Sequence, residues 1–246
     1  MKKIFLTHIL SIVALFVAQA QMPVDSIVAD IRHMAQWQES HTVAECDSVA
    51  HEWVESIARQ DLFTYASQAQ KILFPPYSTQ KGRIAFRRLL ERLLQSGEDE
   101  FALMRYRYMY ESLCVNNEGD VATDFIYYDA DGNEHTLQSH RGHKTLIIFN
   151  DPECEECAAL RRYLAEHGEL QGVPIDSATT VLVIYPDEPT DAWRSAVAHY
   201  PAEWIVGYSE DVSDLYDLRT LPSTYLLDDN HVILLRDAHS YITAAH

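Results

Sequence analysis

The chain has 246 residues, of which 47% are hydrophobic, and it carries a formal net charge of −18 at pH 7. This length and composition are typical of a globular protein with one or two domains. The strong negative charge argues against nucleic acid or an anionic membrane surface as a partner and favours a soluble exported protein. Most of the acidity lies in residues 121–246, which hold 22 acidic and 7 basic side chains.

Residues 1–20 have the pattern of a secretory signal peptide. Lys2 and Lys3 form a basic start, an apolar stretch follows, and Ala18-Gln19-Ala20 is a cleavage signal. The apolar stretch is shorter than the ~20 residues that a membrane-spanning helix needs, and no cysteine lies near the cleavage site to carry a lipid. We therefore expect an exported, periplasmic protein without stable membrane insertion, in a compartment where disulfides persist.

Residues 21–118 are predicted to form an all-α N-terminal domain, because apolar side chains recur there at helical intervals. Asp25 is a candidate N-cap of the first helix. Five helices are expected. The first follows Pro23, the second spans residues 47–58, and the third ends at Pro75-Pro76. The last two span residues 84–94 and 101–113.

The fourth of these helices carries a basic cluster: Lys81, Arg83, Arg87, Arg88 and Arg92. Such a run is either a binding patch or a solvated helix face whose charges pair with acidic neighbours. The second interpretation is favoured, because export and the acidic balance argue against a nucleic-acid partner.

Residues 119–246 follow a turn-rich boundary and are predicted to alternate strands with helices. The expected strands are residues 125–128, 134–137, 145–149, 179–185, 204–208, 223–227 and 232–235. The expected helices are residues 158–167, 190–200 and 211–218, and Gly168 is expected to end the first of them. This order predicts an α/β domain with a mixed sheet.

Cys154 and Cys157 stand at C-x-x-C spacing between an apolar strand and the start of a helix. This arrangement is typical of a thioredoxin-type redox site. Residues i and i+3 share one face in the first turn of a helix, so the two sulfurs can close a short disulfide. The first sulfur also lies near the positive end of the helix dipole, which favours its thiolate.

A second motif, Leu221-Pro222, directly precedes the strand predicted at residues 223–227. Together with the C-x-x-C pair and a hairpin at residues 129–132, it gives the motif order of the TlpA/peroxiredoxin-related group. Residues 121–237 resemble the thioredoxin-like domain of that group. The entire chain resembles secreted two-part proteins of anaerobic Gram-negative bacteria, in which a helical domain of unknown function precedes such a domain.

This resemblance implies a role for each residue of the two motifs. Cys154 would be the attacking thiol and Cys157 the resolving thiol. Pro222 would be the cis-proline, and the Leu221 backbone would pair with an extended substrate. The resemblance also implies a membrane partner that donates electrons.

The sequence departs from the pattern of the group at three positions. Glu153 stands where a tryptophan often precedes the first cysteine, and Ile148 stands where thioredoxins keep a buried carboxylate. The chain ends at His246, which leaves little room for the usual final helix. The first two departures put efficient proton transfer in doubt.

Four carboxylates crowd Cys154: Asp151, Glu153, Glu155 and Glu156. At ~7 Å in water, each carboxylate destabilises a thiolate at Cys154 by about 0.6 kcal/mol. A helix N-terminus stabilises the thiolate by only ~0.3–1 kcal/mol. Arg161 and Arg162 would offset part of this effect. We therefore expect Glu153, Glu155 and Glu156 to tune the site toward a more reducing couple.

Other kinds of site fit less well. A peroxiredoxin centre needs Thr-x-x-Cys, which residues 151–154 do not provide, and a zinc site would need two further ligands among scattered histidines. We expect neither a metal nor another cofactor. Cys46 and Cys114 would either form a structural disulfide or remain free, and both possibilities stay open.

The predicted function is extracytoplasmic thiol–disulfide exchange on protein disulfides, with Cys154 and Cys157 acting as a reductase. The alternative is a thioredoxin-fold binding or scaffold module with weak or no redox activity. The position of Ile148 and the lack of any chemical motif in the helical half favour that alternative.

Overall fold

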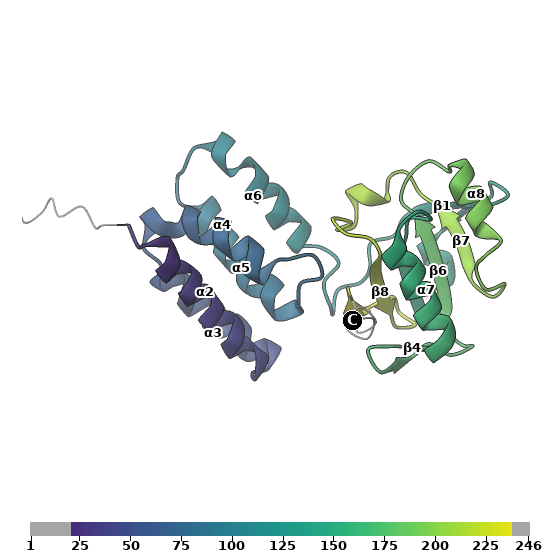
Figure 1. Cartoon of the computed structure of the whole chain (residues 1–246), viewed down its shortest axis with the longest axis horizontal. Coiled ribbons are helices and arrows are strands. Elements are labelled where there is room, and N and C mark those ends of the chain that lie inside the picture. The colour runs from purple at the N-terminus through teal and green to yellow at the C-terminus, as the bar shows by residue number, and fades with distance from the viewer. Residues whose placement is uncertain (1–20, 238–246) are drawn as a thin grey trace, which may run out of the picture.

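The computed structural model of the chain describes residues 21–237. The predicted signal peptide and the chain end at His246 lie outside the described residues. A helical part and a part built on a sheet lie next to each other along the long axis of the molecule (Figure 1). This arrangement confirms the predicted fold class.

The N-terminal part consists of α-helices that share one hydrophobic core. These helices are α2 (Val24–Glu39), α3 (Val43–Ser56), α4 (Leu62–Leu73), α5 (Gln80–Leu94) and α6 (Glu100–Leu113). Helix α5 is central, because it contacts α3, α4 and α6 and fully buries Leu89, Leu90 and Leu93. Burial of these leucine side chains stabilises the bundle by about 2 kcal/mol each.

The starts of two helices differ from the sequence-based expectation. Pro23 occupies the N-cap of α2 without a side-chain hydrogen bond, so the expected cap at Asp25 is wrong. Helix α3 begins at Val43, earlier than expected, because Thr42 and Glu45 form a capping box that satisfies two main-chain N–H groups.

Within residues 21–237, seven strands form one mixed sheet in the order β2-β1-β7-β6-β3-β8-β9. They are β1 (Ile126–Asp129), β2 (Glu134–Thr136), β3 (Thr145–Phe149), β6 (Thr180–Tyr185), β7 (Ile205–Tyr208), β8 (Ser223–Leu227) and β9 (Ile233–Arg236). Strand β3 pairs in parallel with β6 and antiparallel with β8, and all of its residues are buried. This confirms the mixed sheet that the element order predicts.

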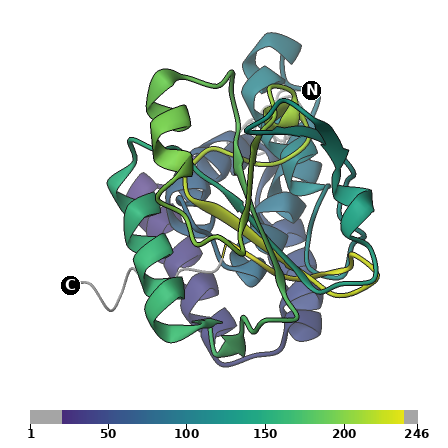
Figure 2. The same ribbon diagram turned by 90° about the vertical axis from the view of Figure 1, so that its right-hand side faces the viewer.

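Different elements cover the two faces of the sheet. Helix α7 (Glu155–His167) packs Leu160 and Leu164 against Ile148 on one face, and it lies along one side of the sheet in Figure 2. The other face is aromatic: the Tyr225 ring meets the rings of Phe149 and Tyr216 edge-on, and the Phe149 and Tyr216 rings are tilted against each other. Smaller elements are the hairpin β4 (Glu169–Leu170) and β5 (Val173–Pro174) and helix α8 (Asp191–Val197).

The boundaries of three predicted helices can be compared with the structure. Gly168 ends α7 in the left-handed conformation, as expected, and α8 ends at Val197 instead of residue 200. The expected helix over residues 211–218 is wrong: only a 3-10 turn forms at Val212–Asp214. Burial of Val212 and Tyr216 against the sheet outweighs the local helical pattern there.

A network of arginines and carboxylates joins the two parts of the molecule. Arg236 is buried, and its guanidinium donates to the Asp217 carboxylate at 2.9 Å and to the main-chain oxygen of Val115, just after α6, at 3.3 Å. In α5, the buried Arg83 donates to the Glu118 carboxylate at 2.7 Å. These contacts hold the segment after α6 against both the sheet and the helices.

Most side chains of the basic cluster of α5 are paired inside the molecule. Arg88 binds Asp47 of α3 at 2.9 Å, Arg92 lies 3.7 Å from Glu55, and Lys81 donates to the Gln38 main-chain oxygen at 2.7 Å. This supports the interpretation of charges paired with acidic neighbours, although Arg83 is buried and not solvated. No helix among residues 21–237 combines the length and apolarity needed to cross a membrane.

Candidate active site

Two strand ends bring the predicted motifs together. Phe149, the last residue of β3, pairs with Ser223, the first residue of β8. The C-x-x-C segment follows Phe149 and Leu221-Pro222 precedes Ser223, so the antiparallel register places both motifs at one edge of the sheet. As a result, the Sγ of Cys154 lies 3.6 Å from the main-chain oxygen of Leu221.

Cys154 occupies the N-cap of α7, and its thiol is partly exposed. Its Sγ accepts a hydrogen bond from the main-chain N–H of Cys157 at 3.2 Å. The helix begins at Glu155, three residues before the expected start, which brings this free N–H group to the sulfur. Both the N–H donor and the helix dipole favour negative charge on the Cys154 sulfur.

Cys157 lies behind Cys154 and is only 3% exposed. Burial raises the pKa of the Cys157 thiol, and the hydrogen bond with Cys154 raises it further, while a main-chain hydrogen bond from Asp151 acts in the opposite direction. Cys157 is therefore a protonated thiol at neutral pH. The pair combines an accessible outer thiol with a shielded inner one.

The Leu221–Pro222 peptide bond is cis, and Pro222 is buried. Because the Leu221 oxygen faces Cys154, a main-chain acceptor lies directly beside the outer thiol. The role of Leu221 and Pro222 in substrate binding stays a prediction.

The four carboxylates around Cys154 have different surroundings. The side chains of Glu153 and Glu155 are exposed, and Asp151 accepts a hydrogen bond from the main-chain N–H of Glu153 at 2.8 Å. Glu156 is the acceptor of a tyrosine hydroxyl from the helical part. The tuning role of Glu153, Glu155 and Glu156 stays a prediction.

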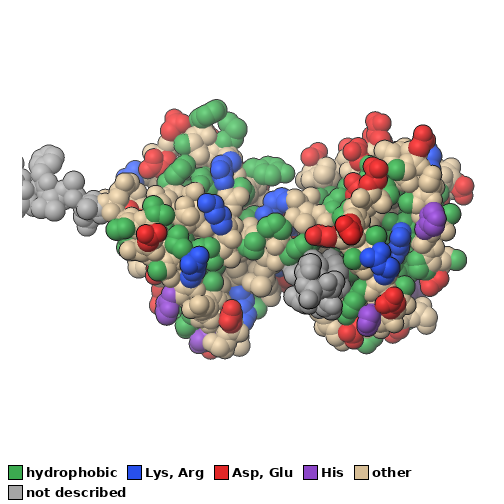
Figure 3. All heavy atoms as spheres, viewed as in Figure 1, with side chains coloured by type: hydrophobic (Ala, Val, Ile, Leu, Met, Phe, Trp, Pro, Cys, Tyr) green, Lys and Arg blue, Asp and Glu red, His purple; other side chains and the backbone are tan. Residues whose placement is uncertain are grey.

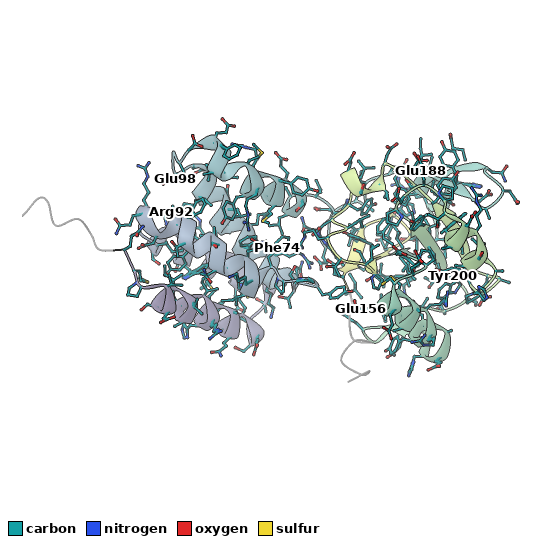
Figure 4. The ribbon with its side chains drawn as sticks, turned by 45° about the horizontal axis from the view of Figure 1, so that its top comes forward. Phe74, Arg92, Glu98, Glu156, Glu188 and Tyr200 are labelled. Carbon is teal, nitrogen blue, oxygen red and sulfur yellow. The ribbon has the colours of Figure 1, made fainter. Side chains whose placement is uncertain are left out.

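That tyrosine, Tyr77, is a site residue that the sequence does not reveal. It lies in the loop between α4 and α5, and its hydroxyl lies 3.0 Å from the Glu156 carboxylate and 3.3 Å from the Leu221 oxygen. In Figure 4, Phe74 of the same loop and Glu156 lie on opposite sides of the junction between the two parts. Tyr77 and Leu221 are 144 positions apart, so no local pattern links them.

A polar group also lies beneath the site. The buried Asn150, which directly follows β3, donates to the Tyr200 hydroxyl at 2.6 Å, and Arg161 stacks over the Tyr200 ring at 4.9 Å. Ile148 is buried among apolar side chains and offers no base there. The sequence does carry a signal for Asn150, because it is a polar residue that directly follows a continuous apolar run.

Among the described residues, no group of three or more His, Cys, Asp or Glu side chains is arranged to hold a metal ion. Cys46 is a buried free thiol whose Sγ lies 3.9 Å from the Gln38 oxygen. Cys114 is an exposed free thiol at the end of α6.

No protein-family model matches the chain. A solved thioredoxin-like protein from Bacteroides caccae ATCC 43185 aligns over 82% of this chain and 76% of its own, with a TM-score of 0.66 and 24% identity. This likeness shows the fold.

Two curated relatives are both named thiol-disulfide oxidoreductase ResA, from Geobacillus kaustophilus (strain HTA426) and Geobacillus thermodenitrificans (strain NG80-2). Each is 25% identical over 114 residues, which are 46% of this chain and 64% of the relative. The chain thus spans somewhat less than two thirds of the curated relatives it matches. The fold, the C-x-x-C pair and these similarities agree: the chain carries a thioredoxin-like domain, similar to that of the ResA relatives, behind a helical N-terminal region.

Proposed function

We propose that the protein is an extracytoplasmic thiol–disulfide oxidoreductase that reduces disulfides of protein substrates. One observation carries the proposal: Cys154 is a partly exposed thiol at a helix N-terminus, with the buried thiol of Cys157 directly behind it. The names of the curated relatives support the same reaction type.

The reaction has two exchange steps. The Cys154 thiolate attacks one sulfur of a substrate disulfide; that S–S bond breaks, and the other sulfur leaves as a thiolate that takes up a proton. Cys157 then loses its proton and attacks the Cys154 sulfur, which releases the second substrate thiol. Two electrons and two protons pass to the substrate, and Cys154 and Cys157 end as a disulfide.

A dithiol reductant must return the Cys154–Cys157 pair to its reduced form after each cycle. We infer a membrane-bound electron donor outside the cytoplasm from the resemblance to the TlpA-related group and from the predicted signal peptide. The Leu221 oxygen beside Cys154 would accept a main-chain N–H of an extended substrate.

Reduction of insulin with dithiothreitol as electron source tests the proposal. The Cys154→Ser variant should fall to the rate of dithiothreitol alone, because the nucleophile is lost. Serine is itself a good N-cap residue, so the variant should keep the start of α7 and remain folded. In Cys157→Ser, the mixed disulfide between Cys154 and insulin should accumulate, which mass spectrometry detects.

The alternative function is a binding or scaffold module that retains the fold. The apolar Ile148, which offers no base near Cys157, favours it. Equal turnover of insulin by the wild type and Cys154→Ser would support this alternative and contradict the oxidoreductase.

A further inference from the structure

The loop between α4 and α5 places a side chain of the helical part inside the redox site. The Tyr77 hydroxyl has a single proton to donate and lies within reach of two acceptors, the Glu156 carboxylate at 3.0 Å and the Leu221 oxygen at 3.3 Å. Both acceptors flank Cys154, whose Sγ lies 3.6 Å from the same Leu221 oxygen.

Contacts on both sides of Tyr77 hold this loop in place, one with the redox domain and one within the helical part. At its start, the Arg219 guanidinium stacks over the Phe74 ring at 3.4 Å. At its end, the buried Arg83 donates to the main-chain oxygen of Ser78 and pairs with Glu118.

The backbone of Tyr77 itself is unusual. Its φ is +57°, a left-handed conformation that aromatic residues rarely adopt and that persists only where the surroundings impose it. The loop is thus built to present this side chain at the site.

One of the two acceptors within reach of the Tyr77 hydroxyl, the Leu221 oxygen, is the one that an extended substrate needs. A carbonyl oxygen has two lone pairs, and at Leu221 the Cys154 thiol and the Tyr77 hydroxyl lie within reach of both. The attacking thiolate of Cys154 has no proton to donate, so a substrate N–H that approaches this oxygen competes with the Tyr77 hydroxyl as the remaining donor. A hollow of about 510 Å³, lined by Ile72, Pro75 and Tyr77 among others, lies next to the loop and offers space for the displaced ring.

We propose that Tyr77 determines the specificity of the site: its hydroxyl competes for the Leu221 oxygen and so slows exchange with extended polypeptide disulfides relative to small disulfides. A small disulfide needs only the sulfur of Cys154, which is partly exposed. This proposal rests on the proposed attack of Cys154 on disulfides.

A stoichiometric exchange reaction tests the proposal. The probes are 5,5′-dithiobis(2-nitrobenzoate) and a ten-residue peptide whose single cysteine is linked to 2-nitro-5-thiobenzoate. In each case the Cys154 sulfur forms a new S–S bond, the S–S bond of the probe breaks, and nitrothiobenzoate leaves with the electron pair as a coloured thiolate. The full chain carries Cys114→Ser and Cys157→Ser, so that only Cys154 is exposed and the reaction stops at the mixed disulfide.

In this background, Tyr77→Phe removes the hydroxyl and keeps the ring. It should raise the ratio of peptide rate to small-disulfide rate by about fivefold, the value of one typical hydrogen bond. The matched control Tyr108→Phe removes a hydroxyl from an exposed tyrosine of α6 and should leave the ratio as it was. Arg219→Gln, which loosens the contact with Phe74, should raise the ratio as well.

An unchanged or lower ratio in Tyr77→Phe, in a variant that unfolds at the same temperature as its parent, would overturn the proposal. The proposed function has a separate readout, because it predicts a difference between wild type and Cys154→Ser in insulin turnover. The exchange with the two probes needs a reactive Cys154 but neither turnover nor an electron donor.

Discussion

At the scale of single residues, Cys154 and Cys157 differ in environment although only two residues separate them. Cys154 is partly exposed and accepts an N–H at the start of α7, whereas Cys157 is buried behind it. The two remaining cysteines repeat this contrast, because Cys46 is buried and Cys114 is exposed. Burial raises the pKa of both Cys46 and Cys157.

This contrast predicts the pattern of alkylation in the native, reduced protein. Iodoacetamide at pH 8 should modify Cys154 and Cys114 and leave Cys157 and Cys46 largely unmodified, because only accessible thiolates react. Peptide mapping by mass spectrometry measures the four sites separately. In guanidinium chloride all four should react, and modification of Cys157 as fast as Cys154 in the native protein would contradict the arrangement.

At the scale of elements, the first turn of α7 sets two electrostatic effects against each other. The helix terminus favours a thiolate at Cys154, whereas the carboxylates of Glu155 and Glu156 in the same turn oppose it. Glu156 is hydrogen-bonded to Tyr77, and Glu155 is exposed. The balance between these effects determines how strongly the reduced form is stabilised.

Replacing Glu155 by Gln should therefore stabilise the reduced form. Loss of about 0.6 kcal/mol of repulsion would shift the equilibrium with a glutathione buffer toward the dithiol by up to about threefold, at pH 9 and low salt. The matched control is Glu166→Gln, because this exposed glutamate lies at the other end of the same helix. Equal shifts in both variants would show that the charge acts on the whole protein and not on Cys154.

The elements that sequence reasoning predicted best are those whose cause is local. The apolar run of β3 and the left-handed stop at Gly168 follow from neighbouring residues alone. The prediction of a helix after Asp211 was wrong because Tyr216 packs against the sheet. That contact cannot be inferred from the residues next to Tyr216 in the sequence. Tyr77 was missed for the same reason, since its partners lie 79 and 144 positions away.

At the scale of the whole molecule, charge on buried side chains couples folding to pH. Burial works against the charged form of Asp217, but hydrogen bonds from Arg219 and the charges of Arg219 and Arg236 outweigh it and hold the pKa of Asp217 below its usual value. Its contribution to stability is therefore present above pH ~4 and is lost only as pH falls further. Acidic side chains predominate over basic ones on the part built on the sheet in Figure 3.

Histidines make the stability of the fold depend on pH in a separate, higher range. Burial lowers the pKa of both His140 and His231, and for His140 the charges of His231, His135 and His143 lower it further. These histidines are scattered in the sequence, but the fold brings them near one another. The unfolded chain binds protons at pH ~6.5, where the folded state does not yet do so.

The free energy of unfolding should therefore decrease as pH falls from 7 to 5. The slope is at most about 1.4 kcal/mol per pH unit for each histidine, because one proton is involved. His140→Gln should reduce this slope, since glutamine does not titrate and can still bond the Tyr127 hydroxyl. Urea titrations at several pH values measure it, and an unchanged slope in a His140→Gln/His231→Gln double variant would refute the assignment.

The pairing of Phe149 with Ser223 also has an evolutionary consequence. Cys154 and Leu221 are 67 positions apart, yet their separation in space depends on the register of β3 and β8 and on the few residues beyond each strand end. Insertions and deletions in the turn between β4 and β5, at the opposite end of β3, should therefore leave the candidate site intact. A single inserted residue between Phe149 and Cys154 should move the thiol away from its acceptor. Homologues should accordingly vary widely in the distance between the two motifs and hardly at all in the two short connections.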